Sequence, residues 1–356
     1  MKKIFTLLVL SLLLLNSFES KAQSIQSDEP LYPIRENGKY GYMNKQGEII
    51  IAPQFDYAGY FAEGLACVTI DDRKGFIDKS GNIVIKPQFG KCYGFNEGYA
   101  LVFKKHKELL IDKTGKTIYS VRSYKGDLHQ FHEGYARVCT YHKLFGKYIN
   151  KYKYIDYSGK TVLKVKHSFV DYYFSDGLAA FYDITNESDR ASCKIHEYKM
   201  GYIDKTGKMV IEPKFYYADD FMEGLALAQE THDSKYGFID TTGEFVIEPQ
   251  FDDGTGFYDG LARVKVNGKT SFVDKSGNYV IKDLEYGTSV FRDGFAKILS
   301  SPDSNGKVGY IDKTGIIVIE MQFDDADYFR DGLAKVKIGD KMAYIDTTGA
   351  IVWMEK

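Results

Sequence analysis

The sequence predicts an all-β repeat protein, and its composition and recurring motifs support that prediction. The chain has 356 residues, of which 34 are Gly, 29 are Tyr and 24 are Phe, beside a single Trp. Glycine supplies the backbone conformations of tight turns, and Tyr and Phe favour the pleated surface of a sheet. With 44% hydrophobic and 27% charged residues, the chain has the composition of a globular protein.

The first recurring motif is an apolar pair followed by Asp-Lys-Thr-Gly, as in residues 202–207. The Asp side chain can cap a turn and the Gly can take its left-handed position, so the motif predicts a turn. The last Gly of the motif occurs nine times, at Gly47, Gly81, Gly115, Gly159, Gly207, Gly243, Gly277, Gly315 and Gly349.

The second motif is Phe-x-acid-Gly-apolar-Ala, as in residues 329–334, and all eight copies keep the Phe, the acid, the Gly and the Ala. A weaker motif, Ile-x-Pro-x-Phe, lies between the other two. The second motif places its Gly at Gly64, Gly98, Gly134, Gly177, Gly224, Gly260, Gly294 and Gly332, and the weaker motif is clear at Pro53, Pro87, Pro213 and Pro249.

Together these motifs resemble the WG, or KWG, β-repeat family of bacterial proteins over about residues 31–356. The resemblance implies a β-repeat fold and no defined activity. Another side chain stands in the place of the family's Trp, and units three, four, seven and nine lack the Gly as well. The pairs that keep the Gly include Tyr40-Gly41, Lys74-Gly75, Met200-Gly201 and Val308-Gly309.

Each unit is predicted to contain three antiparallel strands, named A, B and C. Strand A alternates apolar and charged residues, as in 261–266, and the Asn-Gly pair at 267–268 predicts a tight hairpin turn. Strand B is exemplified by residues 236–240. Strand C, such as 244–247, is apolar at three successive positions, which predicts burial on both faces. Pro249 is expected to end its pairing, because proline cannot donate to a ladder.

The units follow one another through residues 31–356, after a polar linker at 23–30. The first unit begins with a strand A at Leu31 and the last ends with a strand C at Trp353, which makes nine units. No strand is left over to close a ring by exchange, and propellers typically have about four to eight blades of four strands. We therefore expect an open β-solenoid or hairpin array, with a closed propeller-like ring as the alternative.

Residues 1–22 have the features of a secretory signal peptide. Lys2 and Lys3 form a charged start, residues 4–15 are apolar, and small residues around Ala22 offer a cleavage site. The apolar stretch is shorter than the roughly 20 residues that a membrane-spanning helix needs. The mature protein is therefore expected to be soluble and either secreted or periplasmic.

Charge and cysteine content narrow the function further. Removal of residues 1–22 leaves 44 basic and 48 acidic side chains, a net charge of −4, which argues against binding to nucleic acid. The positions of the four cysteines do not recur with the repeat, so they do not form a disulfide framework, although one disulfide bridge is possible. They are Cys67, Cys92, Cys139 and Cys193.

No residue pattern points to an enzyme, a metal site or a bound cofactor. The Asp of the first motif recurs in nearly every unit, which predicts turn capping and not catalysis in one unit. His129, His132, Cys139 and His142 include a spacing that zinc can use, but strand A of unit four separates the two pairs by roughly 20 Å. No Gly-rich phosphate loop, Gly-x-Ser-x-Gly elbow or His-Glu-x-x-His motif occurs.

Unit length varies almost only between strands A and B. The distance from the second-motif Gly to the next first-motif Gly rises from 17 residues to 25 and 30 in units four and five. The inserted residues lie within 140–151 and 181–199, and insertions on one edge of a repeat array commonly mark its binding edge. The expected binding residues there are Tyr141, His142, Phe145, Tyr148, Arg190, His196 and Tyr198.

These observations predict a non-catalytic exported scaffold that mediates protein interaction in the cell envelope. Its partner would be a protein or an envelope polymer, and no membrane insertion is expected after signal removal. The alternative is a cell-surface or periplasmic glycan-binding module, since Tyr and Phe rings can stack on sugar rings.

We expect the mature chain to begin near residue 23 and to contain no long helix. The mass of the exported protein should show the loss of residues 1–22, and circular dichroism of residues 23–356 should give a β spectrum. A substantial helical signal, or an exported protein that keeps its first 22 residues, would contradict this expectation.

Overall fold

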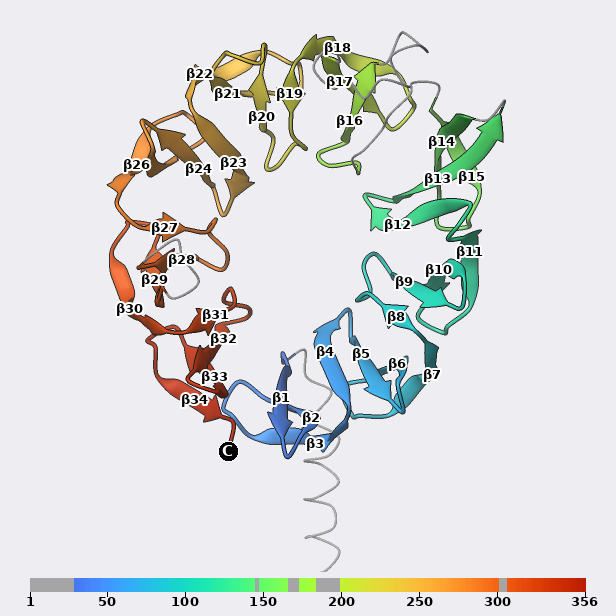
Figure 1. Cartoon of the computed structure of the whole chain (residues 1–356), viewed down its shortest axis with the longest axis vertical. Coiled ribbons are helices and arrows are strands. Elements are labelled where there is room, and N and C mark those ends of the chain that lie inside the picture. The colour runs from blue at the N-terminus through green and yellow to red at the C-terminus, as the bar shows by residue number, and fades with distance from the viewer. Residues whose placement is uncertain (1–28, 145–146, 166–172, 184–198, 301–305) are drawn as a thin grey trace, which may run out of the picture.

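The computed structural model shows a closed ring of nine small antiparallel sheets, a nine-bladed β-propeller (Figure 1). It describes residues 29–144, 147–165, 173–183, 199–300 and 306–356, with the backbone alone at 142–144, 147–150 and 183. None of the described residues belongs to a helix long and apolar enough to cross a membrane.

Each sheet is a blade whose strands follow one another in the chain, and the blades are numbered in chain order. Blade 1 contains β1 (Tyr32–Glu36), β2 (Lys39–Met43) and β3 (Ile49–Phe55). Blade 2 contains β4 (Tyr57–Ala62), β5 (Leu65–Ile70), β6 (Arg73–Ile77) and β7 (Ile83–Phe89). Blade 3 contains β8 (Lys91–Cys92), β9 (Tyr99–Lys104), β10 (Lys107–Asp112) and β11 (Thr117–Arg122). Blade 4 contains β12 (Gly126–His132), β13 (Tyr135–Leu144), β14 (Lys147–Ile155) and β15 (Thr161–Lys164). Blade 5 contains β16 (Leu178–Asp183), β17 (Lys199–Asp204) and β18 (Met209–Phe215). Blade 6 contains β19 (Tyr217–Ala218), β20 (Ala226–Gln229), β21 (Tyr236–Ile239) and β22 (Phe245–Phe251). Blade 7 contains β23 (Asp253–Tyr258), β24 (Leu261–Val266), β25 (Lys269–Val273) and β26 (Tyr279–Leu284). Blade 8 contains β27 (Gly287–Thr288), β28 (Phe295–Leu299), β29 (Val308–Asp312) and β30 (Ile317–Phe323). Blade 9 contains β31 (Asp325–Ala326), β32 (Leu333–Ile338), β33 (Lys341–Asp346) and β34 (Ile351–Met354).

In a four-stranded blade the first strand lies nearest the axis of the ring and the last lies at the circumference (Figure 1). The second, third and fourth strands are the predicted strands A, B and C. The prediction of three-stranded units therefore missed the innermost strand. This strand has only two residues in β8, β19, β27 and β31, too few to show an alternating pattern in the sequence.

The ring is closed, so the expectation of an open solenoid is wrong and the alternative of a closed ring is right. Blade 9 packs directly against blade 1, and Tyr32, Tyr344 and Trp353 are buried in one core between them. The Tyr344 hydroxyl donates to the Pro33 carbonyl oxygen at 2.9 Å, and the Tyr32 hydroxyl donates to that of Asp331 at 2.9 Å. Closure rests on side-chain packing and not on strand exchange, which is why a count of strands did not reveal it.

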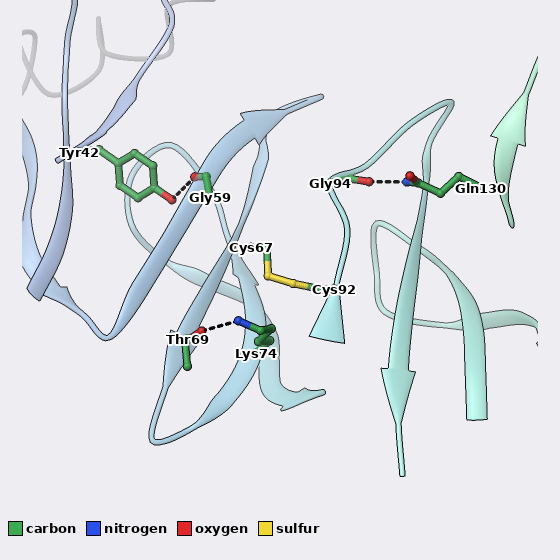
Figure 2. Close-up of a disulfide and its surroundings, with 8 residues drawn as sticks. All are labelled: Tyr42, Gly59, Cys67, Thr69, Lys74, Cys92, Gly94 and Gln130. Carbon is green, nitrogen blue, oxygen red and sulfur yellow. Dashed lines mark hydrogen bonds between the residues drawn. A yellow bond between two sulfur atoms is a disulfide. The ribbon is translucent and has the colours of Figure 1, made fainter. Parts of the chain in front are cut away.

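The donor of the closing seam, Tyr344, occupies the same position in strand B as the donor at other seams. The hydroxyl of Tyr42, on strand B of blade 1, donates to the carbonyl oxygen of Gly59 in blade 2 at 2.8 Å (Figure 2). Tyr310 of blade 8 donates to Asp327 of blade 9 in the same way at 2.7 Å. Burial raises the pKa of Tyr42, Tyr310 and Tyr344, so their hydroxyls stay protonated donors at neutral pH.

The predicted turns are confirmed. In the hairpin between strands A and B of blade 7, Asn267 and Gly268 have φ of 51° and 79°. In the turn between strands B and C of blade 8, Asp312 Oδ1 accepts hydrogen bonds from the backbone nitrogens of Thr314 at 2.9 Å and Ile316 at 3.1 Å. Hydrogen bonds from the Thr314 side chain and from the turn backbone hold the pKa of Asp312 below its usual value. All nine first-motif glycines have a positive φ.

Strand C forms the outer edge of each blade, so the prediction that it is buried on both faces is wrong. Val246 is 49% exposed, whereas its neighbour Ile247 is buried. Pro249 does not end the pairing either, because the strand bulges around it and Phe251 pairs again with Tyr236. A bulge tolerates proline since it leaves one residue out of the ladder.

This bulge explains the Gly at the start of strand B. A Cβ on Gly41 would overlap the carbonyl oxygen of Ile51 and would lie 2.7 Å from the nitrogen of Pro53. Blade 3 has Leu109 in the corresponding place, and its outer strand β11 pairs with residues 107–110 of β10 without a break. Blade 3 therefore lacks both the Gly and the bulge beside it.

One disulfide links two blades. Cys67 of β5 in blade 2 is bonded to Cys92 of β8 in blade 3 (Figure 2). The sequence allowed for one such disulfide bridge. Cys139 is a buried free thiol, and burial raises its pKa to about 11, so it is protonated at neutral pH. Cys193 lies outside the described residues.

We expect Gly41→Ala to destabilise the fold more than Gly98→Ala does. Gly98 has a φ of 84°, but no atom lies within 4 Å of the position that an added methyl group would take, so strain alone should cost about 1 kcal/mol. At Gly41 the methyl group meets backbone atoms, which should cost about 2–3 kcal/mol. Lys265→Ala is the control, with a change of less than about 0.5 kcal/mol. Urea unfolding followed by circular dichroism measures all three, and equal losses for the two Gly variants would contradict this account.

Candidate functional site

The antiparallel strands distribute the turns between two faces of the ring. Successive turns of a meander alternate between the two ends of its strands. The turns from the inner strand to strand A, formed by the acid-Gly pair of the second motif, therefore share one face with the turns from B to C. We call this the clasp face, and we call the opposite face, which carries the A–B turns, the hairpin face. As expected, Lys113 Nζ of a B–C turn lies 3.2 Å from Glu63 Oε2 of an acid-Gly turn.

The acid-Gly turns of neighbouring blades are joined by a hydrogen bond that we call the carboxylate clasp. Each is a two-residue hairpin turn with both residues at positive φ, for example 51° at Glu97 and 84° at Gly98. The Glu63 carboxylate accepts a hydrogen bond from the backbone nitrogen of Gly98, in the next blade, at 2.9 Å. The clasp recurs at seven seams, with the acids Glu63, Glu97, Glu133, Asp176, Glu223, Asp259 and Asp293 accepting from Gly98, Gly134, Gly177, Gly224, Gly260, Gly294 and Asp331.

The Lys of the first motif supports the clasp from the neighbouring blade. Lys113 Nζ donates to the carbonyl oxygen of the acid that it pairs with, at 3.0 Å. Lys79 Nζ donates to the Glu29 carbonyl oxygen at 2.8 Å, and Lys45 lies beside Gly332 at the closing seam. A lysine contact of this kind is thus present at both seams of blade 1. The repeated acids and lysines of this face therefore hold blades together.

A hollow of about 580 Å³ lies on the clasp face beside the acid-Gly turns of blades 6 to 9. We give the name rim site to five side chains of its lining, Tyr60, Tyr258, Arg292, Tyr328 and Arg330. The Arg292 Cζ lies 5.3 Å from the ring centroid of Tyr258 and 5.2 Å from that of Tyr328. The Arg330 Cζ lies 4.5 Å from the centroid of Tyr60. Each guanidinium is held by cation–π contacts, so the rim site alternates aromatic rings and cations.

Closure of the ring builds the rim site. Arg330 belongs to blade 9 and Tyr60 to β4 of blade 2, so their contact spans blade 1, whose described sheet starts at β1. The Tyr60 hydroxyl lies 3.5 Å from that of Tyr344, which connects the rim site to the core of the closing seam. Lys297 Nζ adds a further cation 4.6 Å from the centroid of Tyr328. In an open array these groups would lie at opposite ends of the molecule.

The rim site offers guanidinium donors beside aromatic rings. Arg292 and Arg330 are exposed, and the rings beneath them fix the direction of their donors. Within the described residues, no group of three or more His, Cys, Asp and Glu side chains could hold a metal ion. The ring nitrogens of His129, part of the weak zinc pattern, lie 3.0 Å from the Tyr173 hydroxyl and 2.6 Å from an Arg137 nitrogen.

The binding residues predicted from the sequence lie at the hairpin face or beyond the described residues. Tyr141 of β13 is 36% exposed, and its hydroxyl donates to Asp127 Oδ2 at 2.9 Å. The backbone of His142 lies in β13 and that of Tyr148 lies in β14, so the two residues stand on the paired strands of one hairpin. The other four predicted residues lie outside the described residues, and they are Phe145, Arg190, His196 and Tyr198.

The insertion of unit four is not a loop. Residues 140–151 mostly continue the ladder between β13 and β14, which have ten and nine residues, whereas β24 and β25 of blade 7 have six and five. The blade-4 hairpin is therefore longer than its counterparts. Most of the insertion of unit five, at 181–199, lies outside the described residues.

Sequence reasoning missed the rim site, although the sequence carries a signal for it. The variable position of the Phe-x-acid-Gly motif holds Tyr258, Arg292 and Arg330 in units seven to nine, a run of large recognition side chains. In the linear sequence these positions are more than 30 residues apart. Only the ring places them side by side around its axis.

The repeats match a known family. The family model of the WG containing repeat matches five segments, residues 40–73, 75–107, 200–231, 236–269 and 309–341. The chain is a WG-repeat protein. The matched segments are those of the units that keep the Gly beneath the outer-strand bulge, at Gly41, Gly75, Gly201, Gly237 and Gly309.

Solved structures resemble this WG-repeat protein in fold at low sequence identity. A crystal structure of the eukaryotic initiation factor has a TM-score of 0.64 at 12% identity, over 93% of this chain and 96% of that one. Hsv2p of Kluyveromyces lactis has a TM-score of 0.39 at 9% identity, over 69% and 89%. Prolyl oligopeptidase B of Galerina marginata has 0.45 at 10% identity, over 76% and 51%. No curated protein matches the sequence.

We expect Glu97→Ala to show the strength of one carboxylate clasp. Glu97 accepts hydrogen bonds from the backbone nitrogens of Glu133 and Gly134, at 2.5 and 2.9 Å, and from the Tyr157 hydroxyl at 2.9 Å. Their loss should lower the free energy of unfolding by about 2 kcal/mol, and Glu97→Gln, which keeps an acceptor, should lose less. The exposed acid Glu248 on the outer strand is the control, and an equal loss for Glu248→Ala would contradict a role for the clasp.

Proposed function

We propose that this WG-repeat protein is a non-catalytic scaffold that binds a protein partner on the clasp face of the ring. The observation that carries the proposal is the rim site, where Arg292 and Arg330 are held over the rings of Tyr258, Tyr328 and Tyr60. Tyr and Arg dominate the energetically important positions of protein interfaces. Because the rings already restrict both guanidinium groups, little side-chain entropy is lost when a partner binds.

The geometry of the rim site supports a protein partner more than a sugar. A sugar ring needs an open aromatic face, whereas Arg292 lies against both Tyr258 and Tyr328. Lys297 lies against Tyr328 as well. Planar guanidinium donors suit the carboxylates of a protein chain, which they bind with two parallel hydrogen bonds. The glycan-binding alternative therefore has less support than protein interaction.

The proposal places this interaction outside the cytoplasm, in the periplasm or the secreted fraction. The signal-peptide features of residues 1–22 support export. The disulfide between Cys67 and Cys92 supports it independently, because disulfides persist mainly in oxidising compartments.

The blade-4 hairpin is the competing surface for the same partner. It lies on the hairpin face, its strands β13 and β14 extend beyond their counterparts, and Tyr141 is partly exposed on it. A test of the proposal must therefore change each face separately.

Capture of a partner by the immobilised protein tests the rim site. Residues 23–356 are exposed to an envelope extract of the source cells, and the captured protein is quantified by mass spectrometry. Arg292→Ala/Arg330→Ala should reduce the captured amount about tenfold or more, since truncation of an interface hot spot costs about 2 kcal/mol. Arg73→Ala/Lys269→Ala, which removes two cations from the hairpin face, is the matched control and should leave capture unchanged.

A third variant makes the experiment decisive between the two faces. It replaces residues 141–150 by an Asn-Gly turn like the one at 267–268, and thermal melting verifies that every variant is folded. Full capture by the rim variant together with loss of capture by the shortened hairpin would refute the rim site and favour the hairpin face. Undiminished capture by both would refute both surfaces.

A further inference from the structure

The hairpin face carries a concentration of positive charge at blade 3. The turn between β9 and β10 consists of Lys104-Lys105-His106-Lys107, and Arg122 and Lys125 lie at and after the end of β11. All these side chains are exposed. In the part of the chain that the structure describes, no carboxylate forms an ion pair with any of these lysines or with Arg122. The turn therefore presents uncompensated positive charge.

The lack of a counter-charge has a cause in the repeat. At other seams a carboxylate follows strand C and joins the two neighbouring A–B turns. Asp252 accepts a hydrogen bond from the backbone nitrogen of Asn267 at 2.6 Å and forms an ion pair with Lys235. Gly90 stands in the corresponding place before blade 3. The same carboxylate contacts recur at Asp56 and Asp324.

The backbone of this turn is better suited to another residue type. Lys105 has a φ of 55°, at the position where blades 1 and 7 have Asn37 and Asn267, with φ of 50° and 51°. Asn tolerates the left-handed region because its short polar side chain bonds locally, whereas Lys has no such compensation. A local rule broken without a stabilising gain is typical of a functional position.

A groove of about 570 Å³ runs beside the basic turn. Phe89 and Leu109 contribute apolar side chains to its lining, and Ser120 contributes a polar one. The charged groups of its lining are the cations Lys104, Lys105, Lys107 and Arg122. The groove thus combines an apolar surface with a cationic border.

One wall of the groove is an unprotected sheet edge. β11 is the outermost strand of blade 3, and it lacks the proline that interrupts β3, β7, β18 and β22. The backbone nitrogen of Ser123 donates to the His106 carbonyl oxygen at 2.9 Å, and bonded pairs alternate along an antiparallel ladder. The N–H and C=O of Ser120 therefore point away from β10. A row of such groups is a template for another strand.

We propose that the blade-3 edge binds an acidic peptide segment in extended conformation, which adds to β11 as a fifth strand. Main-chain hydrogen bonds to residues such as Ser120 would supply affinity, and the groove, whose floor includes the buried side chains of Phe89 and Leu109, would receive a side chain of the peptide. The cations Lys105, Lys107 and Arg122 would select acidic residues. The basic turn lies on the face opposite the rim site. Loss of binding at one site therefore does not imply loss of binding at the other.

Fluorescence anisotropy with defined peptides tests the proposal. The probe is a labelled nine-residue peptide of alternating Glu and Val, titrated with residues 23–356. Lys105→Glu/Lys107→Glu/Arg122→Glu should weaken its binding about tenfold or more, because charge complementarity becomes repulsion. Lys269→Glu/Lys341→Glu changes the A–B turns of blades 7 and 9 instead and should alter the affinity less than about twofold. Both variants are compared by thermal melting so that a folding defect is recognised.

Two further probes separate strand addition from charge alone. The same peptide with a methyl group on every backbone nitrogen keeps its charge but has no N–H group to donate to a ladder, so it should bind at least about tenfold more weakly. Polygalacturonate at equal charge concentration should not compete with the Glu-Val peptide. Equal affinity for the N-methylated peptide would overturn strand addition, and effective competition by polygalacturonate would overturn a peptide ligand in favour of an anionic glycan. Absence of binding by the unmodified protein would overturn the site itself.

Discussion

The ring depends on how one blade holds the next, and the carboxylate clasp is the repeated element of that contact. Every sheet is made of consecutive strands, so no ladder of the described strands crosses from one blade to another. The seams are therefore held by side-chain packing and by hydrogen bonds between a side chain of one blade and the backbone of another. At each of seven seams an acid accepts a backbone hydrogen bond from the next blade, and a hydrogen bond to a charged group contributes about 1.5–3 kcal/mol. Apolar packing adds to this, for example the contact of Phe76 with Phe95 at 4.9 Å between ring centroids.

Because the repeated residues are occupied by these structural contacts, the variable positions are where function can differ between units. The acid and the Gly of the second motif form the clasp, whereas the residue before the acid is unconstrained by it. That position holds Ala62 in blade 2 but Arg292 and Arg330 in blades 8 and 9. The A–B turns show the same division, since they range from the Asn-Gly turn at 267–268 to the long hairpin of blade 4. Different side chains can thus be presented on both faces without a change to the seams.

The outer strand shows how the same repeat protects its edges. A proline and a bulge interrupt the ladder at the circumference, and the Gly of strand B leaves room for the bulge, as at Gly41 beneath Pro53. Native proteins use these devices to prevent unwanted pairing of edge strands. Blade 3 has lost both, since Leu109 replaces the Gly and β11 contains no proline. Its exposed edge is therefore a departure from the repeat, and the basic turn beside it is a second departure in the same blade.

The sequence by itself determined the local features of this protein. The turns at Asn267-Gly268 and at the first-motif glycines depend on the backbone preferences of single residues, so they could be predicted, and so could the all-β class and the family. Burial of strand C, the innermost strand and the closed ring could not. They depend on where a strand lies in its blade and on the small rotation between successive blades, which accumulates until Trp353 meets Tyr32. For the same reason only the tertiary structure decided the rim site: Arg330 and Tyr60 lie 270 positions apart in the chain and become neighbours because packing at the last seam closes the ring.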